Sequence, residues 1–219
     1  MDYMQIYKAR NEDYLTTIYR LREAFGFVRI SDIAYELSVR PATVSKVISR
    51  LEKRGLVSRE KYHYVYLTEA GEEVAERIIR KHRISENFLS KILGFDEYES
   101  HYYAHYLEHL PDEVIERIYE LLGRPDKCPH GNPLPREKIE SETKLIKLSK
   151  AETGSRCVIK RLVGELRRVL EFAKNHSIKI GDEITIISSS GGVVIISLRN
   201  NSRIEVPLEV SELILVECS

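Results

Sequence analysis

The fold is decided by residues 31–57, which read SDIAYELSVRPATVSKVISRLEKRGLV. Ser31 is a favourable N-cap for a short helix over 32–37, and residues 38–40 suit a tight turn. Pro41 favours the first turn of a second helix, which the glycine of the final RGLV ends. Two helices joined by a three-residue turn predict a helix-turn-helix.

The second of these helices carries basic and small polar side chains on its exposed face. From residue 40 to residue 61 there are seven basic residues and two acidic ones, a local excess of about five positive charges on a chain of zero net charge. Lysine and arginine bind phosphates, while serine and threonine near the helix start reach base edges in the major groove. A helix pair can also be plain scaffold, but the turn length, the basic face and the hairpin that follows favour DNA binding. The candidate DNA-binding residues are Arg40, Pro41, Ala42, Thr43, Ser45, Lys46, Arg50 and Lys61.

Both flanks of this stretch support a winged helix. Residues 56–67 alternate and are rich in valine and tyrosine, which predicts the two-stranded wing. Residues 11–25 repeat apolar side chains at the helical period and stop at Gly26. Asp13 lies in the first turn of that helix, where a carboxylate ordinarily just favours the helix macrodipole.

A second decisive stretch is HYYAHYLEH, residues 101–109. At about 100° per residue, its three histidines and Glu108 fall within about 100° of arc on one helical face. Imidazoles and a carboxylate that converge in this way are what a divalent metal ion requires. Single histidines on helices usually have no such role, but three at i, i+4 and i+8 beside a glutamate favour metal binding.

The preceding helix, predicted over 69–93 with Thr68 as its cap, adds a second candidate position. His82 and Glu86 lie four residues apart on one face of it, which is also an ordinary pattern for an exposed ion pair. Because a histidine-rich helix follows, we interpret His82 and Glu86 as a second metal position rather than as an exposed ion pair. Long amphipathic helices after a winged helix commonly pack against a second copy, which predicts a homodimer and a two-fold symmetric, pseudo-palindromic operator.

The remainder differs in composition. Prolines crowd between 123 and 150, and the strands after a short helix near 165–174 predict a small β-barrel without a catalytic motif. The expected fold is mainly α, α+β overall, with a winged helix-turn-helix, a helical dimerisation domain and the C-terminal barrel. The expected domains are 1–68 for DNA binding, 69–124 for metal binding and dimerisation, 125–150 as a proline-rich linker, and 151–219 as the barrel.

Composition bounds the class of protein. Hydrophobic residues make up 42% and charged residues 31% of the chain, as in globular proteins. No apolar run reaches the roughly 18 residues of a membrane span, and residues 1–14 lack a signal core. Cys128, Cys157 and Cys218 are odd in number and widely spaced, so we expect reduced thiols in a cytoplasmic protein.

Several motifs together resemble those of the diphtheria toxin repressor and manganese transport regulator family. They are EDYLTTIYRL, RLEKRGLV, LTEAG after the wing, RKHRISENFL, the HxxxHxxEH spacing and HGNPLP at 130–135. Their order and spacing cover nearly the whole chain, and the barrel resembles the small C-terminal domain of this family, which is related to the FeoA type. The resemblance implies a primary, activating metal site of Asp13, His105, Glu108 and His109. It also implies an ancillary site of His82, Glu86 and His101, to which a carboxylate of the C-terminal domain is added in some members; the candidate here is Glu165.

The chain departs from both branches of the family. Iron-type members typically have Met at the position of Asp13 and Cys at that of His105, whereas manganese-type members have Asp and Glu there and another Glu at the position of Thr16. Two imidazoles and two carboxylates suit Fe(II) or Mn(II), and the three-domain layout favours Fe(II). Zn(II), Ni(II) and Co(II) are expected to bind at least as tightly in vitro.

These expectations describe a repressor of metal-uptake genes that binds its operator when metal is plentiful. A metal-independent regulator that senses an organic ligand would leave the converging histidines unexplained. A metallohydrolase would need three ligands, an open position and a general base, and neither HExxH nor a nucleophile elbow is present. We therefore expect no enzymatic activity.

Overall fold

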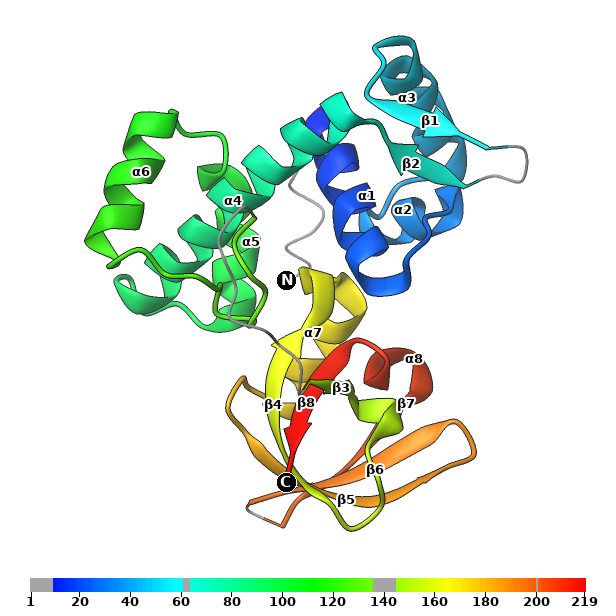
Figure 1. The fold of residues 1–219 in the computed structure, drawn as a ribbon, viewed down its shortest axis with the longest axis vertical. Coiled ribbons are helices and arrows are strands. Elements are labelled where there is room, and N and C mark those ends of the chain that lie inside the picture. Colours follow the sequence, from blue (N-terminus) through cyan, green and yellow to red (C-terminus); the bar gives the residue numbers. More distant parts are fainter. Residues whose placement is uncertain (1–9, 61–63, 136–144, 200) are drawn as a thin grey trace.

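The computed structural model describes residues 10–60, 64–135, 145–199 and 201–219. Helices form the upper part of the molecule in Figure 1, and an antiparallel sheet forms the lower part. The predicted α+β fold is confirmed. Among the described residues, no helix is both long and apolar enough to cross a membrane.

The N-terminal part is a winged helix-turn-helix. Glycine ends the first helix in the left-handed conformation, at Gly26, and proline begins the third, as the sequence predicted. Ser31 is not an N-cap: the second helix begins at Ile30, two residues earlier than predicted, and the carboxylate of Asp32 accepts a hydrogen bond from the backbone N–H of Arg29. The elements are α1 (Asn11–Phe25), α2 (Ile30–Glu36), α3 (Pro41–Lys53), β1 (Val57–Arg59) and β2 (Val65–Leu67).

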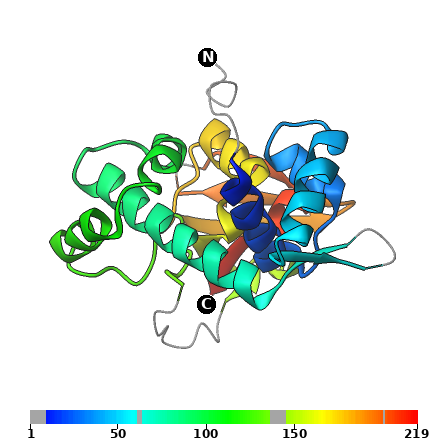
Figure 2. The same cartoon turned by 90° about the horizontal axis from the view of Figure 1, so that it is seen from above.

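Three helices follow the wing. Thr68 caps the first of them by accepting a hydrogen bond from the backbone N–H of Gly71, as expected. This long helix packs against α1, and the other two helices pack against the half of it that is farther from the wing (Figure 2). The helices are α4 (Glu69–Lys91), α5 (Glu97–Leu107) and α6 (Asp112–Leu121).

The C-terminal part is one six-stranded antiparallel sheet in the order β3-β8-β4-β5-β6-β7. Residues 156–162, RCVIKRL, form a central strand that the sequence analysis did not identify, and the helix predicted near 165–174 lies two residues later. The elements are β3 (Ile146–Lys147), η2 (Leu148–Lys150), β4 (Arg156–Leu162), η3 (Val163–Glu165), α7 (Arg167–His176), β5 (Glu183–Ser190), β6 (Val193–Leu198), β7 (Arg203–Pro207), α8 (Leu208–Ser211) and β8 (Ile214–Cys218).

The expectation of three reduced thiols is wrong. Antiparallel pairing of β4 with β8 places Cys157 directly opposite Cys218, and the two form a disulfide despite their separation of 61 residues. Cys128 is not part of a disulfide and is buried. Spacing along the chain gave no sign of this pair, because the register of the two strands creates it.

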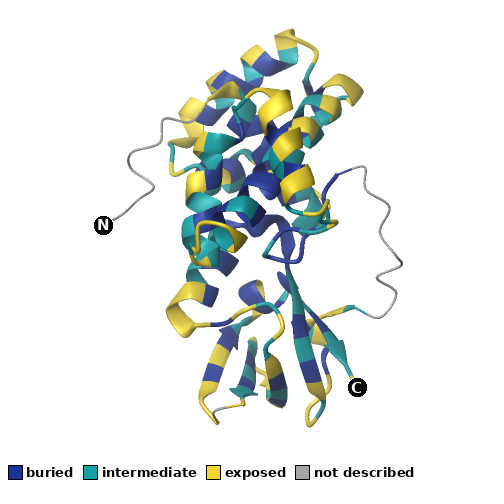
Figure 3. Cartoon of the chain, turned by 90° about the vertical axis from the view of Figure 1, so that its left-hand side faces the viewer, coloured by how far each residue is buried: buried dark blue, intermediate teal, exposed yellow. Residues whose placement is uncertain are grey.

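One hydrophobic core joins the winged helix to the sheet. It runs from Leu15 and Ile18 of α1 to Val169 and Leu170 of α7, and continues among the strands. Figure 3 shows the buried residues passing from the helical part into the sheet. A smaller core beneath α6 includes Leu134, so part of the proline-rich stretch packs against the helices.

Candidate metal centre and DNA-binding face

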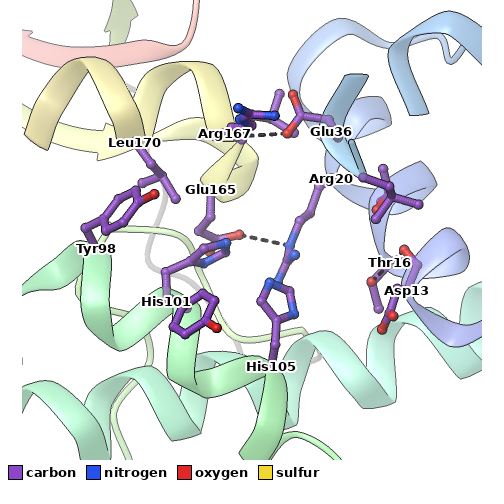
Figure 4. Close-up of a pocket in the computed structure, with 14 residues that line it drawn as sticks. Asp13, Thr16, Arg20, Glu36, Tyr98, His101, His105, Glu165, Arg167 and Leu170 are labelled. Carbon is purple, nitrogen blue, oxygen red and sulfur yellow. Dashed lines mark hydrogen bonds and ion pairs between the residues drawn. The ribbon is translucent and has the colours of Figure 1, made fainter. Parts of the chain in front are cut away.

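Four elements bring the predicted metal ligands together. Helix α1 supplies Asp13, α4 supplies His82 and Glu86, and α5 supplies His101 and His105. Helix α5 ends at Leu107, so Glu108 is its C-cap residue and His109 follows; both lie just past the helix that was predicted to carry them. Glu165 comes from η3, which the sheet holds against this side of the helices (Figure 4).

The predicted primary set surrounds the carboxylate of Glu108. Its Oε2 is 3.5 Å from Nδ1 of His105, and its Oε1 is 3.7 Å from Nε2 of His109. Asp13, Glu108 and His109 each offer a ligand atom, and these atoms lie within 4.8 Å of one another. Asp13 also accepts a hydrogen bond from the backbone N–H of Arg10, an ordinary capping contact at the start of α1.

His82 links the predicted primary and ancillary sets. The ring is fully buried, with Nδ1 2.6 Å from Oε2 of Glu108 and Nε2 3.0 Å from Oε1 of Glu86. Nδ1 of His101 lies 2.7 Å from the same Glu86 oxygen. The two sets therefore form one continuous network rather than two separate clusters.

Two further residues complete a buried group that the sequence analysis missed. Cys128 and His130 join Glu86 and Glu165, with ligand atoms within 4.8 Å of one another. Nδ1 of His130 is 3.4 Å from Oε1 of Glu86, and Sγ of Cys128 is 3.2 Å from Oε1 of Glu165. The C-x-H spacing of CPHG at 128–131 was the available signal. The following Gly131 packs so tightly on β4 that an added Cβ would lie 2.0 Å from the Lys160 carbonyl oxygen.

Burial and charge set the protonation of this network. Burial opposes the ionisation of Glu165, but the adjacent Arg83 and Arg20 hold its pKa at about 2. Burial likewise opposes ionisation of Glu108, and the neighbouring histidines nevertheless keep its pKa far below the ordinary range. Burial lowers the pKa of His101 and of His105, so these two imidazoles are neutral and able to ligate near neutral pH.

The donor set fits a divalent transition-metal ion. Oε2 of Glu86 and Oε1 of Glu108 are buried oxygens with no hydrogen-bond partner in the described part of the chain. Buried carboxylate oxygens are normally satisfied, and a cation is one way to satisfy them. Carboxylates and imidazoles around Glu108 form a hard-to-borderline set, and Cys128 adds a softer sulfur near Glu86.

The candidate DNA-binding residues lie on the outer side of α3 and the turn before it. Seven of them lie in the described part of the chain: Ser45 is half-buried, and the other six, Arg40, Pro41, Ala42, Thr43, Lys46 and Arg50, are exposed. Lys61 lies outside the described residues. Val44, Val47, Ile48 and Leu51 on the opposite side of α3 are buried, so the basic face is the one presented to solvent.

Comparison with known proteins agrees with this geometry. Residues 7–65 match the N-terminal DNA-binding domain of iron-dependent repressors, residues 68–136 match their metal-binding and dimerisation domain, and residues 146–218 match the FeoA domain. The chain is 31% identical to the diphtheria toxin repressor of Corynebacterium glutamicum, over 94% of this chain and 95% of that protein. It is 29% identical to the iron-dependent repressor IdeR of Mycobacterium leprae, over 94% and 96%.

Solved structures give the same result. The crystal structure of T. acidophilum IdeR superimposes with a TM-score of 0.81 at 28% identity, covering 98% of this chain and all of that one. The structure of the manganese regulator SloR gives 0.83 at 29% identity, covering 97% and 100%.

A winged helix-turn-helix joined to a buried carboxylate–imidazole cluster defines a metal-dependent transcriptional regulator. The chain belongs to the diphtheria toxin repressor family of iron-dependent repressors. It is a metal-activated, DNA-binding repressor of metal homeostasis and not an enzyme.

Proposed function

We propose that two divalent ions bind within the network. The primary ion is held by Asp13, His105, Glu108 and His109. The second is held around Glu86, whose Oε1 is the acceptor shared by His82, His101 and His130. Glu86, Cys128, His130 and Glu165 are all buried, and their ligand atoms lie within 4.8 Å of one another. We therefore assign them to this second position, with His82 and His101 between the two ions.

Fe(II) is the preferred ion and Mn(II) the next. The primary set lacks a thiolate, which suits both ions. The curated relatives named above include an iron-dependent repressor, which favours Fe(II), and SloR is a manganese regulator, which keeps Mn(II) close. Zn(II), Co(II) and Ni(II) are expected to compete in vitro because of their position in the Irving–Williams order.

The primary ion controls the winged helix through α1. Asp13 is carried by α1, which packs against α2 and α3, whereas its partners belong to α5 and the turn after it. An ion bound between them would join the winged helix-turn-helix to the helices that follow it. In a homodimer this restricts the spacing of the two recognition helices to about one helical turn of DNA or a multiple, so a pseudo-palindromic operator is bound tightly.

We place the dimer interface on α5 and α6, because apolar side chains are exposed there. Tyr103 and Tyr106 of α5, Val114 and Leu121 of α6 are 36–66% exposed. Apolar groups gathered on the helical part are typical of a surface that a second copy covers. We assign the protein to the cytoplasm, where its operator would be.

The observation that carries this function is the convergence of Asp13 from α1 with Glu108 and His109. The test is anaerobic fluorescence anisotropy on DNA from upstream of its own gene, titrated with Fe(II) and separately with Mn(II). We expect either ion to raise affinity at least tenfold, which is about 1.4 kcal/mol of coupling, and a chelator to reverse it.

Two histidine variants sharpen this test. His109→Ala should abolish the stimulation, whereas His176→Ala changes an exposed histidine of α7 and should not. Metal-indifferent tight binding by the wild type would contradict the metal switch, and so would a His109→Ala protein that is still stimulated.

A further inference from the structure

One positive charge inside the metal network has no evident structural reason to be there. Arg20 of α1 lies on the same helix as Asp13, and its side chain is only 7% exposed. Its guanidinium enters the cavity that Asp13, His101, His105 and Glu165 line (Figure 4). A guanidinium at this place faces the side chains that would bind a divalent cation.

The bonding of Arg20 does not account for its position. Nε is 3.5 Å from Oε2 of Glu165, an ion-pair distance. Yet Nε and Nη2 are buried and make no hydrogen bond to the described part of the chain. Burying guanidinium donors without partners is costly, so a purely structural arginine would be expected to be better satisfied.

Glu165 does not need Arg20 for neutralisation. Nε and Nη2 of Arg83 donate to its two carboxylate oxygens over 2.8 and 3.1 Å, in the paired geometry that arginine favours. Arg83 is itself held by Glu23 and by the Pro133 carbonyl oxygen. Arg20 is therefore a second cation beside a carboxylate that already has one.

We propose that Arg20 is a resident cation that opposes metal binding and so sets the metal concentration at which the network fills. A divalent ion at Glu86 and Glu165 would compete with Arg20 for the same carboxylate, and an ion near His105 would be repelled by its charge. Removing the charge should therefore tighten binding, whereas removal of a ligand would weaken it. This inference rests on the proposed metal-binding function.

The test measures metal binding directly, without DNA. Mn(II) is titrated anaerobically into the wild type and into Arg20→Gln in competition with a fluorescent chelator, and affinity and stoichiometry are read together. We expect Arg20→Gln to bind at least one ion tenfold more tightly with unchanged stoichiometry. Arg20→Lys keeps the charge and should stay within about threefold of the wild type.

The matched control is Arg22→Gln. Arg22 lies on the same helix but pairs with Glu72 outside the network, so its loss should leave Mn(II) affinity unchanged. Equal or weaker binding by Arg20→Gln overturns the inference; Arg20→Met serves as the second uncharged variant if the first does not fold. A wild type that binds no Mn(II) and no Fe(II) would instead overturn the proposed function itself.

Discussion

The backbone N–H of Arg167 donates a hydrogen bond to Oε2 of Glu36 over 2.8 Å. Nη1 of the same arginine donates to Oγ of Ser38 in the turn of the helix-turn-helix. The guanidinium of Arg167 also lies over the ring of Tyr35, 5.7 Å from its centroid. The first residue of α7 therefore holds the end of α2 and the turn that leads into the recognition helix α3. Glu165, two residues earlier, lies in the metal network, so a short stretch of the C-terminal part contacts both functional regions.

Stability should depend on pH through Glu36. Burial raises the pKa of its carboxyl to about 7, and the Arg167 N–H, Arg168, Arg20 and the Arg167 side chain offset this only in part. A folded pKa above the unfolded one means that the stabilisation is complete below about pH 4.5 and is lost as pH rises through about 7. We expect the wild type to lose up to about 3 kcal/mol between pH 5 and pH 8 relative to Glu36→Gln, measured by chemical denaturation. Parallel pH profiles for the two proteins would contradict this.

Gly164 should not tolerate a side chain. Its φ is +69°, and an added Cβ would lie 2.7 Å from the backbone carbonyl oxygen of Arg20. We expect Gly164→Ala to lower the free energy of unfolding by about 2–4 kcal/mol, through both the left-handed conformation and the overlap. Gly191 has a φ of +62° with no atom within 4 Å of an added Cβ, so Gly191→Ala should cost about 1 kcal/mol. Equal losses would show that the contact with α1 contributes nothing.

Lys46 should contribute to DNA affinity through phosphate. It is exposed on α3, whereas the two residues that follow it, Val47 and Ile48, are buried. We expect Lys46→Ala to weaken metal-activated binding about tenfold at low salt and to reduce the slope of log affinity against log salt by about one. The control is Lys91→Ala, which removes an exposed lysine at the end of α4. The prediction fails if both variants show the slope of the wild type.

The disulfide between Cys157 and Cys218 should stabilise the sheet. It joins β4 to β8, next to the end of the chain, and closes a loop of 61 residues. Reduction should lower the free energy of unfolding of this part by about 2–4 kcal/mol. We expect dithiothreitol to lower the thermal midpoint of the wild type but not that of a Cys157→Ser/Cys218→Ser protein. Because cytoplasmic thiols are generally kept reduced, mass spectrometry of alkylated whole cells would establish which form operates there.

Local signals made much of the fold predictable. Pro41 and the glycines at 26 and 55 mark helix ends within a few residues, and their effect needs no distant partner. The convergence of His101, His105 and Glu108 was equally accessible, because about two turns of one helix determine it.

Contacts between distant parts of the chain were not predictable in this way. His130 meets Glu86 across 44 residues only because a loop anchored at Gly131 packs on β4. The strand 156–162 was missed because its apolar run is only three residues long and is flanked by arginine and lysine, and a bulge interrupts its pairing. The burial of Arg20 beside Glu165 could not be predicted at all, because it depends on η3 approaching α1.

The packing of Gly164 against α1 also limits how such a chain can be recombined. Backbone meets backbone there, so the contact leaves no side chain that could adjust to a different neighbour. A chimera that joins the first helix of one relative to the C-terminal domain of another will retain metal control only if both parents keep this spacing. For protein engineering, α1 and the C-terminal part should therefore be kept together, and a sensor with a new operator is better sought by altering the outer face of α3 than by exchanging whole domains.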